Sequence, residues 1–255
     1  MKKLIACDVD GTLIPEGERW VSSEVLKEIR RLTDEGWLFA FASGRQLANL
    51  MAIARDLADR LYYITQNGAA VYSCGNTPEL IAKTPLGQEN ALKIAHEVLE
   101  TAGYDLEISG SNMSYLCPKS EAFRSYMCGY VNMNITELPS PDDVPEEIIK
   151  LSVWSADSSE AHDRLFPEWG SRYRVDIAGD IWLDITSADK GKGLSSLCRY
   201  LGITAADVIA FGDNYNDIPI LDAVGCPYIM ASAPESLQKR YKNICENVAD
   251  VLKTL

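Results

Sequence analysis

The hydrophobic pattern begins with a short apolar strand, residues 4–7, that runs directly into two aspartates and a glycine. An amphipathic helix capped by Ser22 or Ser23 follows and continues to about residue 35. A second apolar run, residues 37–42, then ends at a Ser-Gly-Arg turn. Strand, helix and strand in this order predict a βαβ unit with parallel strands.

The same pattern continues to about residue 83 and resumes near residue 184. Its apolar runs lack strict alternation, which is typical of strands buried on both faces and therefore favours a parallel sheet. A tight Asn67-Gly68 turn leads into a strand over residues 69–73. The expected elements are helices over residues 46–58, 192–201 and 217–223, and strands over residues 61–65, 69–73 and 208–211.

Between these parts the pattern changes. A long amphipathic helix over about residues 89–101 precedes short alternating segments, which suit an antiparallel sheet with one wet face. The sequence therefore predicts an α/β protein in which residues 1–83 and 184–255 form one discontinuous domain and residues 84–183 form an inserted α+β domain. The strands expected in the insert cover residues 104–109, 113–117, 149–154 and 173–177.

Composition narrows the class of protein. Of 255 residues 47% are hydrophobic and 24% charged, and the formal net charge is -13. An acidic chain is a poor match for nucleic acid or anionic membranes, and no apolar run approaches the ~20 residues of a membrane helix. The basic start is followed by too short an apolar segment for a signal peptide. Seven cysteines without a Cys-x-x-Cys pair predict reduced, mostly buried thiols in a cytoplasmic protein.

Four polar clusters follow predicted strands or open a predicted helix of the discontinuous domain. Because ligands bind outside the carboxyl ends of parallel strands, one arrangement brings all four to a single crevice. Asp-x-Asp-Gly alone is also compatible with an ordinary turn, but an EF-hand fails because its first and last ligand positions would be Ala6 and Gly17. The clusters are residues 8–12, residues 43–45, Lys190 and residues 213–217.

The residue types in these clusters favour a hard cation and a phosphoryl group. Three or four carboxylates without a nearby histidine suit Mg²⁺ better than zinc or a calcium cage. A lysine and a hydroxyl beside the cation suit a phosphoryl group, whose transfer requires mainly positioning and charge neutralisation. With two histidines and no Gly-x-Ser-x-Gly elbow, a triad hydrolase is not expected.

The chain resembles the haloacid dehalogenase superfamily phosphatases of the Cof type over essentially its whole length. The resemblance implies a Rossmann-like three-layer core and an α/β cap of the C2B kind. Cys7 stands where an aromatic residue is frequent and is expected to be a small buried hydrophobe, and Ser232 stands where asparagine is usual. The matching motifs are Asp8-Val9-Asp10-Gly11-Thr12, Phe41-Ala42-Ser43-Gly44-Arg45, Lys190-Gly191 and Gly212-Asp213-Asn214-Tyr215-Asn216-Asp217.

The resemblance also implies roles for individual residues. Asp8 would be the nucleophile that forms an aspartyl-phosphate, and Asp10 would protonate the leaving alcohol and then deprotonate water. Asp8, the Asp10 carbonyl and Asp213 would hold Mg²⁺, with Asp217 in support.

The phosphoryl group and substrate would be bound by a second set of residues. Arg45 and Asn67 are read either as turn or helix-start residues or as side chains that face the crevice, because each follows a core strand. The full set is Ser43, Gly44, Lys190 and Asn216, together with Arg45 and Asn67.

The expected activity is Mg²⁺-dependent hydrolysis of a small phosphorylated metabolite. Residues 84–183 carry 17 acidic and 7 basic residues, whereas the remainder carries 20 and 17. This imbalance predicts a neutral or cationic leaving group such as a sugar, unless the charges form a solvated outer face. The alternatives are a phosphosugar mutase, a receiver-like phospho-signalling module or a non-catalytic binding module, and the sequence does not indicate an oligomeric state.

Residues outside the motifs are expected to have structural roles. His96 and His162 are interpreted as surface or structural residues. Core packing is preferred over sugar stacking for Trp154, Trp169 and Trp182.

Overall fold

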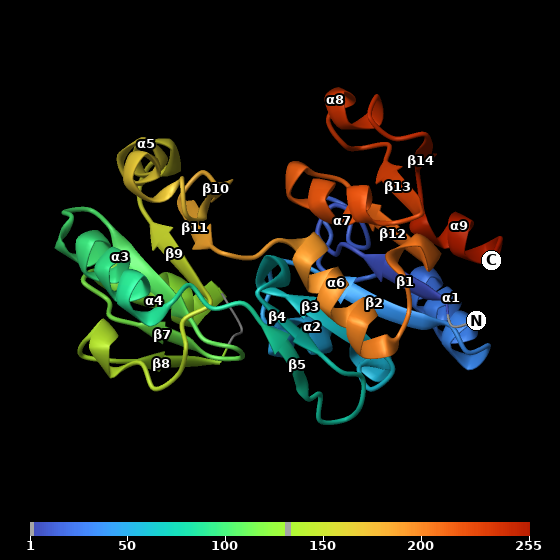
Figure 1. The fold of residues 1–255 in the computed structure, drawn as a ribbon, viewed down its shortest axis with the longest axis horizontal. Coiled ribbons are helices and arrows are strands. Elements are labelled where there is room, and N and C mark those ends of the chain that lie inside the picture. Colours follow the sequence, from blue (N-terminus) through green and yellow to red (C-terminus); the bar gives the residue numbers. More distant parts are fainter. Residues whose placement is uncertain (1–2, 131–133) are drawn as a thin grey trace. The chain divides into compact units, whose positions relative to one another are not determined.

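The computed structural model describes residues 3–130 and 134–255, which form two compact units (Figure 1). Unit 1 consists of Met1–Ala82 and Asp189–Leu255, and unit 2 consists of Lys83–Ala188.

Unit 1 contains a sheet with strand order β14-β13-β12-β1-β2-β3-β4-β5. The strands from β14 to β3 are all parallel to their neighbours. β4 pairs antiparallel with β3, because only a short 3₁₀ turn, Gln66–Gly68, separates the two strands. The strands are β1 (Leu4–Cys7), β2 (Leu38–Ala42), β3 (Tyr62–Thr65), β4 (Ala70–Tyr72), β5 (Leu80–Lys83), β12 (Val208–Gly212), β13 (Cys226–Met230) and β14 (Asn243–Cys245).

Helices cover the sheet of unit 1. The predicted cap of the first helix is confirmed, since the Ser22 hydroxyl accepts a hydrogen bond from the Val25 amide at 3.2 Å. α6 and α7 pack on one face, and α1 contacts both β2 and α9. The helices are α1 (Ser23–Asp34), α2 (Leu47–Ala54), α6 (Lys190–Leu201), α7 (Ile218–Ala223), α8 (Glu235–Gln238) and α9 (Val248–Lys253).

The central strands are buried on both faces. Leu4, Ala6 and their neighbours face α6 and α7, whereas the alternate residues, among them Phe39 and Phe41, are equally buried. This explains the absence of alternation in the sequence. Parallel strands with both faces covered bring their carboxyl ends, and the polar residues that follow them, to one edge of the sheet.

Unit 2 is an α+β unit whose sheet has the order β10-β11-β9-β6-β7-β8. All pairs are antiparallel except β7 with β8. The elements are α3 (Gln88–Glu100), β6 (Asp105–Ser109), β7 (Ser114–Leu116), α4 (Glu121–Tyr130), β8 (Ile135–Glu137), β9 (Lys150–Trp154), α5 (Ser158–Trp169), β10 (Arg174–Gly179) and β11 (Trp182–Thr186).

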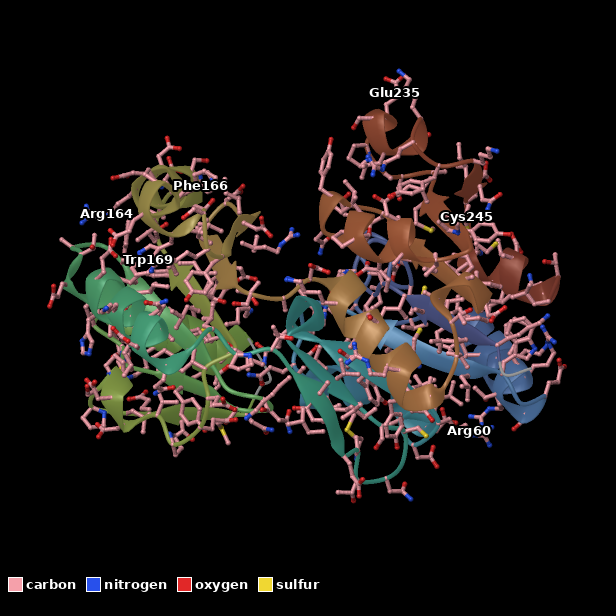
Figure 2. All side chains as sticks on the ribbon, in the orientation of Figure 1. Arg60, Arg164, Phe166, Trp169, Glu235 and Cys245 are labelled. Atoms are coloured by element: carbon pink, nitrogen blue, oxygen red, sulfur yellow. The ribbon has the colours of Figure 1, made fainter. Side chains whose placement is uncertain are left out.

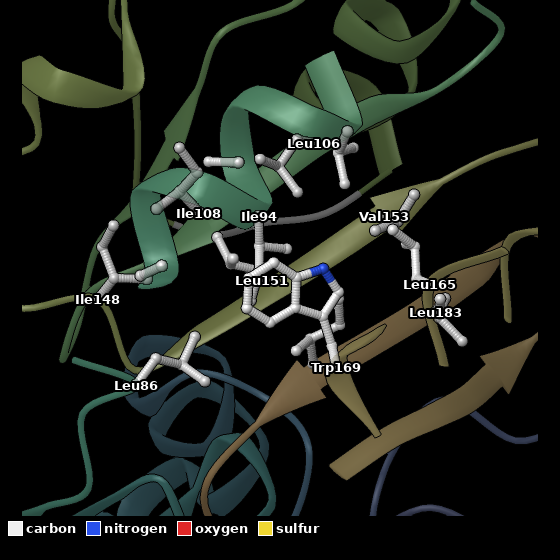
Figure 3. Close-up of a cluster of buried hydrophobic side chains, with 14 of the residues drawn as sticks. Leu86, Ile94, Leu106, Ile108, Ile148, Leu151, Val153, Leu165, Trp169 and Leu183 are labelled. Carbon is white, nitrogen blue, oxygen red and sulfur yellow. The ribbon is translucent and has the colours of Figure 1, made fainter. Parts of the chain in front are cut away.

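The core of unit 2 lies between its sheet and the helices α3 and α5 (Figure 3). Trp169 is buried there and donates from its indole Nε1 to Glu97 at 2.9 Å. Trp154 and Trp182 pack around Phe123 of α4. The prediction that the tryptophans pack in the core is thus confirmed for Trp169, and the other two are partly buried.

The surface of unit 2 carries the two histidines. His162 stacks on the exposed ring of Phe166, which Figure 2 labels on α5. His96 on α3 pairs with Asp142 at 2.9 Å. Both positions agree with the surface or structural roles expected from the sequence.

The structure departs from the prediction at the boundary between the units and in elements that were not expected, among them strand β5. The chain returns to unit 1 at Asp189, five residues after the predicted boundary at 184, because β11 pairs with β9 and β10 of unit 2. Two helices of unit 2, α4 and α5, were not expected. α5 begins at an Asp157 cap but contains Pro167, which interrupts a helical pattern in the sequence.

The cysteines also differ from expectation. Only Cys7, Cys198 and Cys245 are buried, whereas Cys128 is exposed. The other three are partly exposed because they lie at or just beyond strand ends, so the prediction of mostly buried thiols is wrong. In the described part of the chain, no helix is both long and apolar enough to cross a membrane.

Candidate active site

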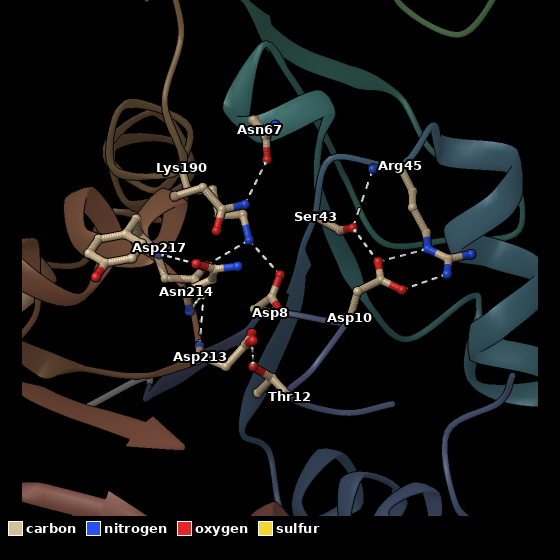
Figure 4. Close-up of polar contacts among 12 residues, drawn as sticks. Asp8, Asp10, Thr12, Ser43, Arg45, Asn67, Lys190, Asp213, Asn214 and Asp217 are labelled. Atoms are coloured by element: carbon tan, nitrogen blue, oxygen red, sulfur yellow. Dashed lines mark hydrogen bonds and ion pairs between the residues drawn. The ribbon is translucent and has the colours of Figure 1, made fainter. Parts of the chain in front are cut away.

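The site of unit 1 is built at the carboxyl ends of neighbouring strands. β1 lies between β2 and β12, so the residues that follow these strands emerge side by side. Asp8 follows β1 and its amide donates to the Phe211 carbonyl of β12 at 3.0 Å. Ser43 follows β2, and Asp213 follows β12. Figure 4 shows these side chains gathered at the strand ends.

Lys190 reaches Asp8 from the start of α6. The Asp189 carboxylate accepts from the Lys192 amide at 2.8 Å and caps this helix, so that Lys190 is its first residue. The buried Lys190 ammonium donates to Asp8 Oδ1 and to Asp217 Oδ1, the latter at 2.6 Å. Burial opposes the lysine charge, but the carboxylates of Asp217 and Asp8 outweigh it and raise the pKa of Lys190.

Asp217 is fully buried and anchors two parts of the site. Its Oδ1 accepts from Lys190, while its Oδ2 accepts from the backbone amides of Asp213 at 2.9 Å and Asn214 at 3.1 Å. Both oxygens are therefore occupied by protein donors. Asp217 is suited to hold Lys190 and the loop that carries Asp213, rather than to bind an ion directly.

Asp213 is fixed by the turn that follows β1. The Thr12 hydroxyl donates to Asp213 Oδ1 at 3.0 Å. Gly11 lies so close that a Cβ built on it would stand 2.2 Å from Asp213 Oδ2. Burial, followed by the negative charge of Asp217, raises the pKa of Asp213.

The carboxylates of this site fit a hard divalent cation. Asp8, Asp213 and Asp217 each place one oxygen within 4.8 Å of the others. Asp8 Oδ2 is buried without a hydrogen-bond partner, and burial raises the pKa of Asp8. An unpartnered buried carboxylate oxygen is unfavourable unless an ion or ligand binds it, and an all-oxygen donor set suits Mg²⁺.

Asp10 lies next to Ser43, and its side chain is half exposed (Figure 4). The Ser43 hydroxyl is 3.5 Å from Asp10 Oδ2. Arg45 donates to both carboxylate oxygens, from Nε at 2.9 Å and from Nη2 at 2.5 Å. The structure therefore places the Arg45 guanidinium on Asp10.

Asn67 links two of the predicted substrate-binding residues. Its side-chain oxygen accepts from Asn216 Nδ2 at 3.4 Å, and its amide group lies 3.3 Å from a Cβ built on Gly44. The Asn67 backbone adopts a left-handed conformation, and its amide donates to the Ser43 carbonyl at 2.9 Å. Gly44, Asn67 and Asn216 thus form a contiguous group beside Ser43.

The structure brings all ten sequence-predicted residues together in unit 1. Two further residues were not singled out. Thr12 orients Asp213, and its place inside the first motif was the available signal. Asn49 accepts from Arg45 Nη1 at 2.7 Å and lies in the first turn of α2, and no pattern in the sequence pointed to it.

Comparisons with known proteins agree with this geometry. Residues 5–254 match the family model described as haloacid dehalogenase-like hydrolase. A protein of Buchnera aphidicola subsp. Schizaphis graminum, named provisionally as a phosphatase, is 31% identical over 252 residues, which are 94% of this chain and 88% of that protein. The 5-amino-6-(5-phospho-D-ribitylamino)uracil phosphatase YbjI of Escherichia coli is 23% identical, over 98% of this chain and 94% of its own length.

Solved structures show the same fold. The structure of the HAD subclass IIB sugar phosphatase BT4131 superimposes with a TM-score of 0.81 at 22% identity, covering 99% of this chain and 98% of that one. The chain belongs to the haloacid dehalogenase-like hydrolases. Within this family it is a phosphatase of the Cof type, as the sequence motifs predict.

Proposed function

We propose that the protein is a Mg²⁺-dependent phosphomonoester hydrolase that works through an aspartyl-phosphate on Asp8. The observation that carries this proposal is the state of the Asp8 carboxylate. One oxygen is bound by the buried Lys190, and the other is buried and unpartnered beside Asp213. A carboxylate held in this way is positioned as a nucleophile, and its site offers cationic neutralisation for a phosphoryl group.

Asp8, the Asp10 carbonyl and Asp213 would hold Mg²⁺. The ion would neutralise phosphoryl charge when bound. The Ser43 hydroxyl and the Lys190 ammonium bind phosphoryl oxygens, with Gly44 and Asn216 beside them. Asp217 keeps Lys190 charged and oriented through the 2.6 Å contact.

In the first half-reaction an Asp8 oxygen forms a bond to phosphorus, and the bond from phosphorus to the leaving oxygen breaks. Asp10 gives its proton to that oxygen, which departs as an alcohol. In the second half-reaction water attacks the same phosphorus and passes a proton to Asp10. The bond from phosphorus to Asp8 breaks, inorganic phosphate leaves, and the Asp8 carboxylate is restored.

We further propose that unit 1 is the catalytic core, that unit 2 is the cap, and that the substrate is a small sugar or sugar-alcohol phosphate. Of the 17 acidic residues in 84–183, 13 are exposed, so solvation accounts for much of that charge. Lys150 of unit 2 is buried and paired with Asp184 at 3.5 Å. Burial opposes its charge, but the carboxylates of Asp184 and Glu107 outweigh this effect and raise the pKa of Lys150. Within unit 2 this lysine is already neutralised by carboxylates and offers little unpaired positive charge to a second substrate phosphate, which favours an uncharged leaving group.

Phosphate release with and without Mg²⁺ tests the proposed activity. The panel comprises hexose monophosphates, sugar-alcohol phosphates and nucleoside diphosphates, and wild type is compared with Asp8→Asn. The expected result is Mg²⁺-dependent release from the sugar phosphates, with loss of activity in Asp8→Asn and an unchanged circular dichroism spectrum. An active Asp8→Asn protein would refute the covalent route, and equal turnover of nucleoside diphosphates would refute the substrate class.

The same assays distinguish the alternatives. Isomerised hexose phosphate after addition of a sugar bisphosphate would identify a mutase. A phosphoprotein that persists for minutes would identify a signalling module. The presence of Asp10 argues against the signalling alternative. A proton-transfer group beside a phospho-aspartate speeds its hydrolysis, whereas a signal requires the phospho-aspartate to persist. A cytoplasmic location stays a prediction from the cysteine content.

A further inference from the structure

The guanidinium of Arg45 is held by the protein at three of its nitrogen atoms. Nε and Nη2 donate to the two oxygens of Asp10, and Nη1 donates to Asn49 Oδ1 at 2.7 Å. The Arg45 backbone is fixed as well, since its amide donates to Ser43 Oγ at 3.3 Å and its carbonyl accepts from the Gln66 amide at 3.0 Å. Both ends of this side chain are therefore anchored.

The paired arginine constrains the plane of the Asp10 carboxylate. The Asp10 backbone is already fixed, because Gly11 donates to the Ile14 carbonyl and Ile14 donates to Val9, both at 2.8 Å. The side chain, however, is half exposed and would otherwise rotate freely. Two parallel N–H bonds from one rigid fork define that rotation.

This arrangement leaves part of the Asp10 carboxylate open to a bound molecule. A carboxylate offers about four lone-pair sites, and Arg45 occupies one on each oxygen. The Ser43 hydroxyl lies 3.5 Å from Oδ2, which leaves Oδ1 as the oxygen whose remaining lone pair can take part in proton transfer, and the fork determines where that lone pair points. We propose that Arg45, oriented by Asn49, is a positioning residue that aims the Asp10 carboxylate at the leaving oxygen and at the attacking water, rather than a ligand of the phosphoryl group.

The inference rests on the proposed function and predicts a specific kinetic pattern. In Arg45→Met, kcat for glucose 6-phosphate should fall about 100-fold, because a misplacement of about 1 Å typically costs that much. KM and the inhibition constant of inorganic phosphate should stay within about twofold. Asn49→Leu, which removes only the distal anchor, should reproduce the pattern with a smaller loss.

A good leaving group separates the two half-reactions. p-Nitrophenyl phosphate expels a phenolate that needs no proton, so Arg45→Met should release about one equivalent of p-nitrophenolate rapidly and then turn over slowly. In an Asp10→Asn background, Arg45→Met should cause no further loss, because the arginine acts through the carboxylate. Arg45→Lys should not restore kcat, since an ammonium cannot form the planar fork.

Arg240→Met is the matched control. Arg240 also donates from Nε and Nη2 to an aspartate, Asp222, in unit 1, and its side chain is half exposed. Its removal should leave kcat unchanged. A raised phosphate inhibition constant in Arg45→Met, a further loss in the Asp10→Asn background, or full rescue by Arg45→Lys would each overturn the positioning role.

An NMR measurement tests the contact without turnover. Exchange of the Arg45 Nε proton with solvent should be slow in wild type and should accelerate in Asp10→Ala and in Asn49→Leu. Exchange that is unaffected by Asp10→Ala would overturn the inference even in an inactive protein. Absence of phosphate release by wild type, combined with a protected Nε proton, would refute the proposed function and leave the Arg45–Asp10–Asn49 arrangement supported.

Discussion

Replacing Gly11 by alanine should displace a carboxylate of the proposed metal site. Gly11 has φ +87°, and a Cβ built on it stands 2.2 Å from Asp213 Oδ2 and 2.6 Å from Asp213 Cγ. Ordinary contact begins at 3.4 Å, so the Asp213 carboxylate must move by about 1 Å. That movement would break the 3.0 Å bond from Thr12 and remove an oxygen from the ion.

Gly17→Ala provides the matched control. Gly17 has φ +86°, but nothing lies within 4 Å of a Cβ built on it. Both substitutions pay the cost of a left-handed alanine, about 1–2 kcal/mol of unfolding free energy. Only Gly11→Ala also moves Asp213, so the difference between the two variants isolates that displacement.

The assay measures urea unfolding and the Mg²⁺ concentration that gives half-maximal phosphatase activity. Gly17→Ala should lose about 1–2 kcal/mol of stability, and Gly11→Ala should lose about 1 kcal/mol more because it also breaks the hydrogen bond from Thr12. Gly11→Ala alone should require more Mg²⁺ and lose about 100-fold in kcat, the usual effect of a 1 Å misplacement. If Gly11→Ala and Gly17→Ala show the same Mg²⁺ requirement and the same kcat, the close approach of Gly11 to Asp213 has no functional consequence and the reasoning is refuted.

Three further outcomes are expected. Lys190→Met should lower the unfolding free energy of the metal-free protein by about 3–5 kcal/mol, because it leaves buried carboxylates unpaired; an unchanged urea midpoint would contradict this. Since burial raises the Asp213 pKa, the folded state binds more protons than the unfolded state, so metal-free stability should fall as pH rises from about 4, and Asp213→Asn should flatten that slope in urea titrations with EDTA. Iodoacetamide should modify the exposed Cys128 before the buried Cys7, whose pKa is raised by burial and by Asp8. Mass spectrometry of partial digests measures the order, and earlier modification of Cys7 would contradict this expectation.

Much of the fold was predictable because its signals are local. The helix from Ser23 to Asp34 has its cap and its apolar stripe in consecutive residues, and β1, β2 and β12 are continuous apolar runs. Elements whose stability depends on distant partners were harder to predict. The prediction placed part of β11 in the wrong domain. β11 belongs to unit 2 because it pairs with β9 and β10, and the sequence pattern does not reveal that pairing.

The sequence by itself determined which polar residues gather at one edge of the sheet, because acids, a hydroxyl and a lysine beside buried strands must converge when those strands are parallel. Tertiary structure alone decided how they pair. Lys190 bridges Asp8 and Asp217, and Arg45 donates to both carboxylate oxygens of Asp10. Such pairings depend on ångström-scale distances between segments far apart in the chain, and neither periodicity nor motif spacing encodes those distances.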